Sequence, residues 1–371
     1  MTYLDANATE PLRPQARAAV LAALDLVGNP ASVHAAGRAA RRLLEESREA
    51  IAARFGARPA DLVFTSGGTE ADALAVHALG RGRRLIVGAT EHLAVRAATA
   101  GAAVLPVDRS GIADLEELRR LLREGPALVC LMLANNETGT IQPVAAAAAL
   151  CRAAGALLHV DAVQAAGRVA VDVASLGADS LALSAHKLGG PKGAGALLVA
   201  PALSAMLAPL IAGGGQERGR RGGTPALPAI AGFAAACQAA DWQTADCQAA
   251  GGAAALAPLR DAAERGAQEA GALPLGADAA RLPNTTCLAL PGVRADTQVI
   301  ALDLAGVQVS AGAACSSGKV GRSHVLDAMG AGDLAGEAVR VSLPWCATPA
   351  DIDAFLRAYH SMAGRLSRRA A

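Results

Sequence analysis

The stretch DSLALSAHKLGGPKGAGALLVA (residues 179–200) places two short apolar runs on either side of a glycine-rich turn. The runs 179–185 and 195–200 have the length and composition of buried β-strands. Only three lysines occur among the chain's 34 lysines and arginines, and Lys187 and Lys192 both lie here. An amine, unlike a guanidinium, can lose its proton and condense with an aldehyde. The turn therefore suggests a chemically active lysine at position 187, and a surface lysine is the alternative that this stretch alone leaves open.

The same pattern of apolar runs extends upstream of this stretch. Further runs of strand length cover residues 61–66, 84–89, 103–108, 127–134 and 156–162. Helix-length segments such as DLEELRRLLRE (114–124) and PVAAAAALCRAAG (143–155) lie between them. This alternation predicts an α/β fold with a mostly parallel seven-stranded sheet and helices on both faces.

The last third of the chain has a different pattern. After an alanine-rich stretch that ends near residue 270, the apolar runs become short and alternating, which predicts a smaller α+β domain. We expect a large domain over residues 15–250 and a small C-terminal domain over residues 251–371. Residues 1–14 are expected to belong to the small domain.

Composition argues against several classes of function. The net charge is +1 and aromatic residues make up 2% of the 371 residues, so neither a nucleic-acid nor a membrane surface is expected. Apolar runs are too short for a membrane helix, and the N-terminus lacks a signal-peptide pattern, which makes the cytoplasm the default location. The seven cysteines form no C-x-x-C pair, so we expect free thiols in a reducing compartment and no metal site.

Two of the cysteines contrast with each other. Cys130 lies in the apolar run ALVCLML and is expected in the core. Cys315 lies in SAGAACSSGKVG (310–321), among small residues that cannot bury it well. Cys315 therefore stands apart from the cysteine expected in the core.

Asp161 ends the apolar run 156–162, where a carboxylate is costly unless it meets a cation or a donor. The protonated nitrogen of a pyridine ring would be such a partner, and Gln164 is close enough in sequence to approach the same ligand. A carboxylate that caps the following turn is the alternative for Asp161.

The segment TSGGTEADALAV (65–76) follows a predicted strand and opens a predicted helix. Its glycines, including Gly68, allow close approach, and its first amides and Thr69 could bind a phosphate. It lacks the Lys-Ser/Thr ending of a nucleotide-binding loop. His92 and Asn136 also follow predicted strands and could contact a cofactor ring, although a structural histidine and a turn asparagine are the alternatives.

Ten ordered motifs resemble those of the cysteine desulfurases of the NifS/IscS-like type, which are pyridoxal phosphate enzymes of the class V aminotransferase group. They are YLDANATEPL, NPASVHAAGRAAR, FTSGGTEADALAV, TEHLAV, NNETGTIQPV, HVDAVQAAG, SAHKLGGPKGAGAL, GGGQERGRRGGT, RLPNTT and SAGAACSSGKVGRSHVL. The resemblance implies fold type I of the pyridoxal-phosphate-dependent transferases, a cofactor in the large domain and a homodimer. It also implies that the small domain carries the loop with the reactive cysteine.

The resemblance implies roles for individual residues. Lys187 would bind the cofactor as a Schiff base and His92 would stack on its ring, while Cys315 would be the nucleophile. Asn136 and Arg340 would bind the substrate. The implied cofactor contacts are Gly68, Thr69, His92, Asn136, Asp161, Gln164, Ser184, His186 and Lys187, with Thr224 supplied by the second subunit.

The implied reaction converts L-cysteine to L-alanine and leaves the sulfur on Cys315 as a persulfide, for transfer to an iron–sulfur scaffold or a thiolation protein. A selenocysteine lyase or another class V aminotransferase remains an alternative, as does a non-catalytic sulfur-relay or scaffold protein. Arg322 stands where relatives often have proline, from which we expect a looser turn. The C-terminal AGRLSRRAA differs from the tail by which housekeeping members engage their scaffold.

Overall fold

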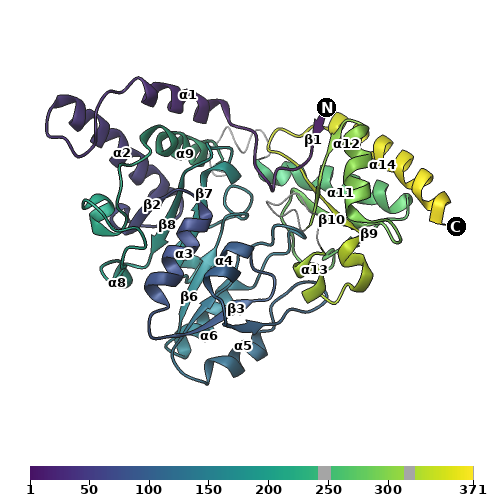
Figure 1. Cartoon of the computed structure of the whole chain (residues 1–371), viewed down its shortest axis with the longest axis horizontal. Helices are drawn as coiled ribbons and strands as arrows, with labels where there is room; N and C mark the ends of the chain where they lie inside the picture. Colours follow the sequence, from purple (N-terminus) through teal and green to yellow (C-terminus); the bar gives the residue numbers. More distant parts are fainter. Residues whose placement is uncertain (241–251, 313–321, 371) are drawn as a thin grey trace.

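A seven-stranded sheet forms the centre of the larger part of the protein (Figure 1). The structure is a computed structural model that describes residues 1–240, 252–312 and 322–370. The strand order is β2-β8-β7-β6-β5-β3-β4. The strands are β2 (Leu62–Thr65), β3 (Arg84–Gly88), β4 (Ala103–Leu105), β5 (Ala127–Cys130), β6 (Leu157–Asp161), β7 (Ser180–Ser184) and β8 (Gly195–Val199). Each lies within an apolar run that predicts it.

Strand direction in this sheet follows from the length of the connections. The pairs from β4 through β3, β5 and β6 to β7 are parallel, whereas β8 is antiparallel to both β7 and β2. A parallel crossover needs a dozen or more residues, and only residues 185–194 join β7 to β8. The mostly parallel sheet is therefore confirmed, with one reversed strand where the chain turns back through Lys187.

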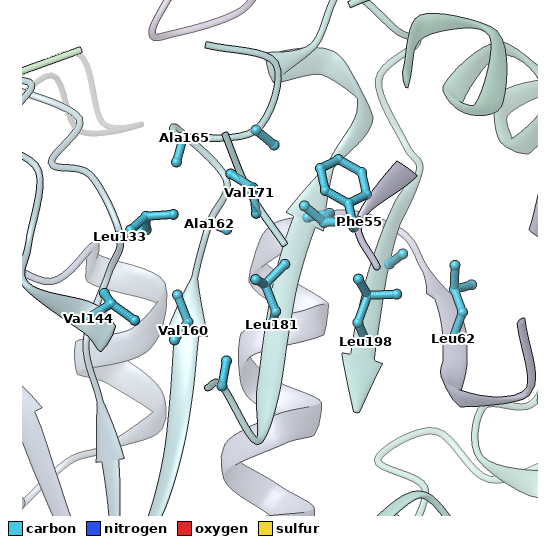
Figure 2. Close-up of a cluster of buried hydrophobic side chains, with 14 of the residues drawn as sticks. Phe55, Leu62, Leu133, Val144, Val160, Ala162, Ala165, Val171, Leu181 and Leu198 are labelled. Atoms are coloured by element: carbon cyan, nitrogen blue, oxygen red, sulfur yellow. The ribbon is translucent and has the colours of Figure 1, made fainter. Parts of the chain in front are cut away.

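Helices cover both faces of the sheet, and side-chain alternation determines what faces each layer. In β6, Leu158 and Val160 belong to one buried cluster, which also contains residues of α2 (Ala35–Arg54), α5 (Leu115–Leu122), α6 (Val144–Ala153) and α9 (Leu227–Ala239). Figure 2 shows Val160, Leu181 and Leu198 in this cluster. The opposite face packs against α3 (Gly68–Leu79) and α4 (Leu93–Ala98). Because successive side chains of a strand point to opposite faces, His159 and Asp161 point toward the α3 side.

The remaining elements of the larger part are short or peripheral. They are the α-helices α1 (Pro14–Leu24), α7 (Val173–Leu176) and α8 (Pro201–Ser204), and the 3-10 helices η1 (Pro59–Asp61), η2 (Ala185–Lys187) and η3 (Gln216–Gly219). Cys130 is fully buried, as expected. No helix in the described ranges is long and apolar enough to cross a membrane.

A second core lies around a four-stranded sheet of order β12-β13-β10-β9. Its strands are β9 (Leu273–Leu275), β10 (Thr285–Ala289), β12 (Ser310–Ala311) and β13 (Ala338–Ser342). The associated helices are η4 (Ala253–Ala255), α11 (Leu256–Glu269), α12 (Ala295–Leu304), α13 (His324–Ala328), η5 (Gly332–Gly336) and α14 (Pro349–Ala370). Phe355 and Tyr359 of α14 are fully buried in this core.

The N-terminal residues join the second core. β1 (Thr2–Tyr3) pairs in parallel with β11 (Val307–Gln308), and Leu4 is fully buried among residues of the second core. In Figure 1 the N-terminus lies beside α12 and α14, far along the chain. We propose that the two cores correspond to two domains, with residues 1–14 assigned to the smaller one.

Candidate active site

A cavity of about 230 Å³ lies at the carboxyl ends of β6 and β7, beside the start of α3. Parallel strands of α/β sheets bind their ligands at this end. Every residue that the sequence predicts as a cofactor contact within one chain lines this cavity: Gly68, Thr69, His92, Asn136, Asp161, Gln164, Ser184, His186 and Lys187. Thr224, which is predicted to act in the other subunit, is exposed and is not among the lining residues.

Lys187 ends the short helix η2, directly after β7. Its Nζ donates hydrogen bonds to the carbonyl oxygens of Asn7 and Ala8, the latter at 3.0 Å. Burial, assisted by the positive charges of Arg340 and Arg168, lowers the pKa of Lys187 to about 7. A large fraction of the amine is therefore unprotonated and nucleophilic at neutral pH.

Asp161 is the last residue of β6 and is 6% exposed. Its Oδ1 accepts a hydrogen bond from the Val163 amide at 2.8 Å, so it also caps the turn that follows the strand. Burial and the neighbouring Asp72 raise the pKa of Asp161 to about 7. A cation placed in the cavity would stabilise the ionised carboxylate, which is the arrangement that a protonated pyridine nitrogen requires.

The start of α3 forms an anion-binding end to the cavity. Gly67 is the N-cap and gives no side-chain hydrogen bond to the first turn. A Cβ atom on Gly68 would lie 2.7 Å from Cγ2 of Val163, so a side chain does not fit there without movement. The helix N-terminus, Thr69 and Ser184 are suitable donors for a phosphate. Together with the amine of Lys187 and the carboxyl of Asp161, this donor set fits pyridoxal phosphate.

His92 and Asn136 lie at the cavity with other contacts that fix them. His92 is the N-cap of α4, and its Nδ1 accepts a hydrogen bond from the Ala94 amide at 3.1 Å. Partial burial lowers the pKa of His92, which favours a neutral ring. The backbone carbonyl of Asn136 accepts hydrogen bonds from Asn7 and from Arg340.

Several predicted residues make contacts that the sequence does not reveal. Gln164 Nε2 donates to the Asn7 carbonyl at 3.0 Å, and Gln164 Oε1 accepts a hydrogen bond from Arg168. Protein groups therefore bind both the nitrogen and the oxygen of this side-chain amide. His186 Nδ1 lies 3.2 Å from Thr9 Oγ1. These contacts tie the cavity to residues 7–9 at the start of the chain.

Arg340 is not among the residues that line the cavity. It lies on β13, is 5% exposed, and donates to Asp5 Oδ1 at 2.7 Å and to the Asn136 carbonyl at 3.1 Å. Its buried Nε has no hydrogen-bond partner among the described residues. Arg340 therefore reaches the site through Asn136, a residue of the cavity wall.

The segment that carries Cys315 lies outside the described residues, but its neighbour Arg322 does not. Arg322 forms an ion pair with Asp327 at 2.7 Å and donates to the Gly332 carbonyl. These contacts hold the Arg322 side chain against α13 and the residues after it, and the looser turn expected at Arg322 stays a prediction.

Sequence reasoning missed three cavity residues: Asp72, Met132 and Val163. Asp72 is 2% exposed, and its Oδ1 lies 3.1 Å from Nε2 of His159, whose Nδ1 lies 2.9 Å from Ser180 Oγ. Burial raises the pKa of Asp72 to about 8 and lowers that of His159 to about 4. Helical spacing gave a signal, because Asp72 lies three residues after Thr69 and thus on the same side of α3.

The sequence is similar to curated cysteine desulfurases over nearly its whole length. It is 42% identical over 369 residues to the cysteine desulfurase of Cereibacter sphaeroides, covering 95% of this chain and 93% of the relative. It is 37% identical to the IscS-like cysteine desulfurase of Mycobacterium tuberculosis, covering 100% and 98% of the two chains.

The fold leads to the same group. The crystal structure of a NifS-like protein from Rickettsia africae superimposes with a TM-score of 0.89 at 33% identity, covering 98% of this chain and 99% of that one. Residues 2–355 match the family described as class-V aminotransferase. The chain therefore belongs to the class-V aminotransferase family and, within it, to the NifS/IscS-like cysteine desulfurases.

Proposed function

We propose that this protein is a pyridoxal-phosphate-dependent cysteine desulfurase. The observation that carries the proposal is the cavity in which the partly buried amine of Lys187, with its pKa lowered to about 7, and the carboxyl of Asp161 lie beside an anion-binding helix end. Family membership supports the choice of this chemistry over others that an amine and a carboxyl could perform.

In this proposal Lys187 holds the cofactor, Asp161 pairs with its ring nitrogen and His92 lies against its ring. The start of α3, Thr69, Ser184 and His186 hold the phosphate, and Asn136 and Gln164 face the phenolic oxygen. When bound, the cofactor supplies an aldehyde carbon that joins the amino group of the substrate and a ring that takes up electrons from its Cα.

The chain's own residues then handle the proton, the carboxylate and the sulfur. The free Lys187 amine accepts the proton from Cα of L-cysteine. Family resemblance assigns the substrate carboxylate to Arg340, which would exchange its bond to the Asn136 carbonyl for a bond to that carboxylate. The Cys315 thiolate attacks the substrate sulfur, the Cβ–S bond breaks, and the carbon fragment takes the electron pair and a proton to become L-alanine. L-cysteine and one thiol thus yield L-alanine and one persulfide, with no added oxidant or reductant.

The decisive experiment is mass spectrometry of the purified protein after incubation with L-cysteine. We expect one added sulfur on the peptide that contains Cys315, together with L-alanine in the solution. Cys315→Ala should keep the cofactor and bind L-cysteine but form neither alanine nor sulfide. Sustained alanine formation by Cys315→Ala would instead favour an enzyme that needs no thiol, such as a selenocysteine lyase or another class V aminotransferase.

A second experiment tests whether the protein is catalytic at all. A scaffold or relay protein that kept the fold alone would be colourless, whereas we expect a cofactor chromophore that Lys187→Ala abolishes. Because Schiff-base formation needs the unprotonated amine, attachment of the cofactor to the cofactor-free protein should accelerate as the pH rises through about 7 and level off above it.

We also propose a homodimer in which Thr224 contributes to the second subunit's phosphate site, and a cytoplasmic sulfur acceptor, either an iron–sulfur scaffold or a thiolation protein. Exposure of Thr224 and the five free cysteines of the described residues are compatible with these assignments. Sedimentation of the wild type, and cofactor affinity of Thr224→Ala, test the dimer and the shared site separately.

A further inference from the structure

Glu137 is a buried carboxylate that none of the proposed chemical steps uses. It follows Asn136 in the motif ANNETG and is 2% exposed. Two residues that are far away in sequence contact it: Gly312, just before the segment 313–321, and Ser323, just after that segment. One side chain therefore joins both flanks of the part of the chain that contains Cys315.

The contact with Ser323 is a short hydrogen bond. Ser323 Oγ donates to Glu137 Oε2 at 2.5 Å, and the same Oγ accepts from the Leu326 amide as the N-cap of α13. The backbone amide of Ser323 donates to the Ala335 carbonyl. Ser323 is thus fixed at its side chain and at its backbone. Its bond to Glu137 connects it to the turn that also carries Asn136 of the cavity wall.

The contact with Gly312 is one of close packing. A Cβ atom at this position would lie 2.3 Å from Glu137 Oε2, and Gly312 does not have a left-handed backbone conformation that would by itself require glycine. The absence of a side chain at position 312 is therefore explained by the carboxylate of Glu137.

Buried hydrogen bonds hold the turn that presents Glu137. Asn135 Oδ1 accepts hydrogen bonds from the backbone amides of Glu137 and Thr138, and Asn135 Nδ2 donates to the Thr90 carbonyl. All of these groups are buried. The same turn carries Asn136 of the cavity wall, so the Glu137 carboxylate has a fixed position relative to the cavity.

We propose that Glu137 is a positioning residue for sulfur transfer: it fixes Gly312 and Ser323, the flanks of the segment that contains Cys315, relative to the cavity, and the rate of persulfide formation depends on this contact. The inference rests on the proposed desulfurase function. Glu137 is not among the residues that line the cavity, so we assign its effect to the flanks of the cysteine segment and not to the binding of cofactor or substrate.

The test compares two steps in one holoenzyme. Glu137→Ala should leave the cofactor spectrum and the absorbance change on binding L-cysteine as in the wild type. The single-turnover rate of persulfide formation on Cys315 should fall by roughly 10- to 100-fold, because misplacement of a reacting group by about 1 Å costs that much. Glu137→Gln should stay within about threefold of the wild-type rate, since an amide oxygen still accepts the Ser323 hydroxyl.

Glu264→Ala is the matched control. Glu264 Oε2 accepts a hydrogen bond from the Thr286 hydroxyl at 2.6 Å, so this change also removes a carboxylate–hydroxyl bond. The other side chain hydrogen-bonded to the Glu264 carboxylate is Arg281, which does not flank the cysteine segment. We expect Glu264→Ala to lower the thermal stability without lowering the persulfide rate. Equal losses of that rate in the two alanine variants, or loss of L-cysteine binding in Glu137→Ala, would reduce Glu137 to a structural residue and overturn the proposal.

A second-site test keeps the proposal falsifiable if Glu137→Ala folds poorly. Gly312→Ala should slow persulfide formation, because its Cβ collides with the carboxylate, and Glu137→Ala in the same chain should restore part of the rate. If the effects of the two changes on the rate are independent of each other, the inference is contradicted. If the wild type itself forms no persulfide, the proposed desulfurase function fails. If the wild type forms persulfide and Glu137→Ala forms it at the same rate, only the proposal for Glu137 fails.

Discussion

The buried charges around α2 and those around the active site are arranged in opposite ways. Arg48 and Glu217 form a two-point ion pair with N–O distances of 2.7 and 2.8 Å, and Glu217 also accepts from the Phe64 amide. At the active site, Asp72, Glu91 and Asp161 are buried together, and Glu91 Oε2 has no partner among the described residues. Burial is the main cause that raises the pKa of each of these three acids.

This contrast separates structure from chemistry. In the Arg48–Glu217 ion pair both carboxylate oxygens are hydrogen-bonded, so the pair holds α2, β2 and the loop around Glu217 in contact. Glu217 itself has the uncommon backbone angle φ 49°. Buried carboxyls that form no ion pair with an arginine or a lysine cost stability and acquire shifted pKa values, which is what acid–base chemistry at neutral pH requires. Substitutions in the two regions should therefore have different consequences.

The largest effect is expected from Lys187→Ala. The variant should lose the cofactor chromophore, and its rate of alanine formation should fall by a factor on the order of 10³ or more, because the proposed base and cofactor anchor are both removed. The stability of the cofactor-free protein should fall much less than in Glu217→Ala, because the loss of two hydrogen bonds to backbone carbonyls is offset by removal of a partly buried amine. Absorbance spectra, an alanine assay and urea unfolding measure the three quantities, and a loss of stability comparable with that of Glu217→Ala would break the comparison.

Glu217→Ala should produce the largest loss of stability. Removing one partner leaves Arg48 buried without its main counter-charge, which costs about 3–5 kcal/mol in the free energy of unfolding. Urea unfolding of the cofactor-free protein measures this loss, and Arg48→Met with Glu217→Leu serves as the control in which neither charge remains. A loss no larger than about 1 kcal/mol would show that the ion pair contributes no more than an exposed one.

Asp72→Asn should change the pH dependence of stability. The folded-state pKa of about 8 lies above the ordinary value of 3.8, so the folded protein keeps a proton that the unfolded chain releases between these values. Stability therefore falls as the pH rises through this window, by up to about 1.4 kcal/mol per pH unit from this group.

The variant lacks this titration, so its stability should fall less than that of the wild type between about pH 5.5 and about pH 7.5. Urea unfolding of the cofactor-free protein at the two pH values measures the difference. Parallel pH dependences would mean that Asp72 titrates normally.

The smallest effect is expected at the surface. Arg119 and Glu116 form an ion pair at 2.9 Å on α5, with side chains that are 51% and 77% exposed. Arg119→Ala should change the free energy of unfolding by less than about 0.5 kcal/mol. A thermal melt beside that of Glu217→Ala checks this, and a loss above about 2 kcal/mol would show that burial is not what distinguishes the two pairs.

Much of the fold and the cavity could be predicted because the relevant rules are local. Alternating apolar runs located the strands of the large sheet, and the parallel order brought the residues at the ends of β6 and β7 to one edge. Asp161, Ser184 and Lys187 therefore lie where the sequence predicts, whereas Arg340 contacts the site through Asn136 instead of lining the cavity.

Other contacts had no local signal. The pairing of Asp72 with His159 joins a helix to a strand 87 positions away, and the bond from Ser323 to Glu137 spans 186 positions. Arg322 illustrates the same limit, because the sequence showed that it stands where relatives often have proline but not that its side chain contacts Asp327 and Gly332.

The sequence by itself determined the strand and helix periods, the residues that follow each strand, and the motifs of the desulfurase family. These depend on which way successive side chains point and on residue chemistry, both of which are properties of short segments. Only the tertiary structure decided which buried carboxylates form ion pairs, as Glu217 does with Arg48, and which keep an oxygen without a hydrogen-bond partner, as Glu91 Oε2 does among the described residues. The physical reason is that desolvation and hydrogen bonding depend on groups brought together from distant parts of the chain, and these set the pKa values and contacts of the site.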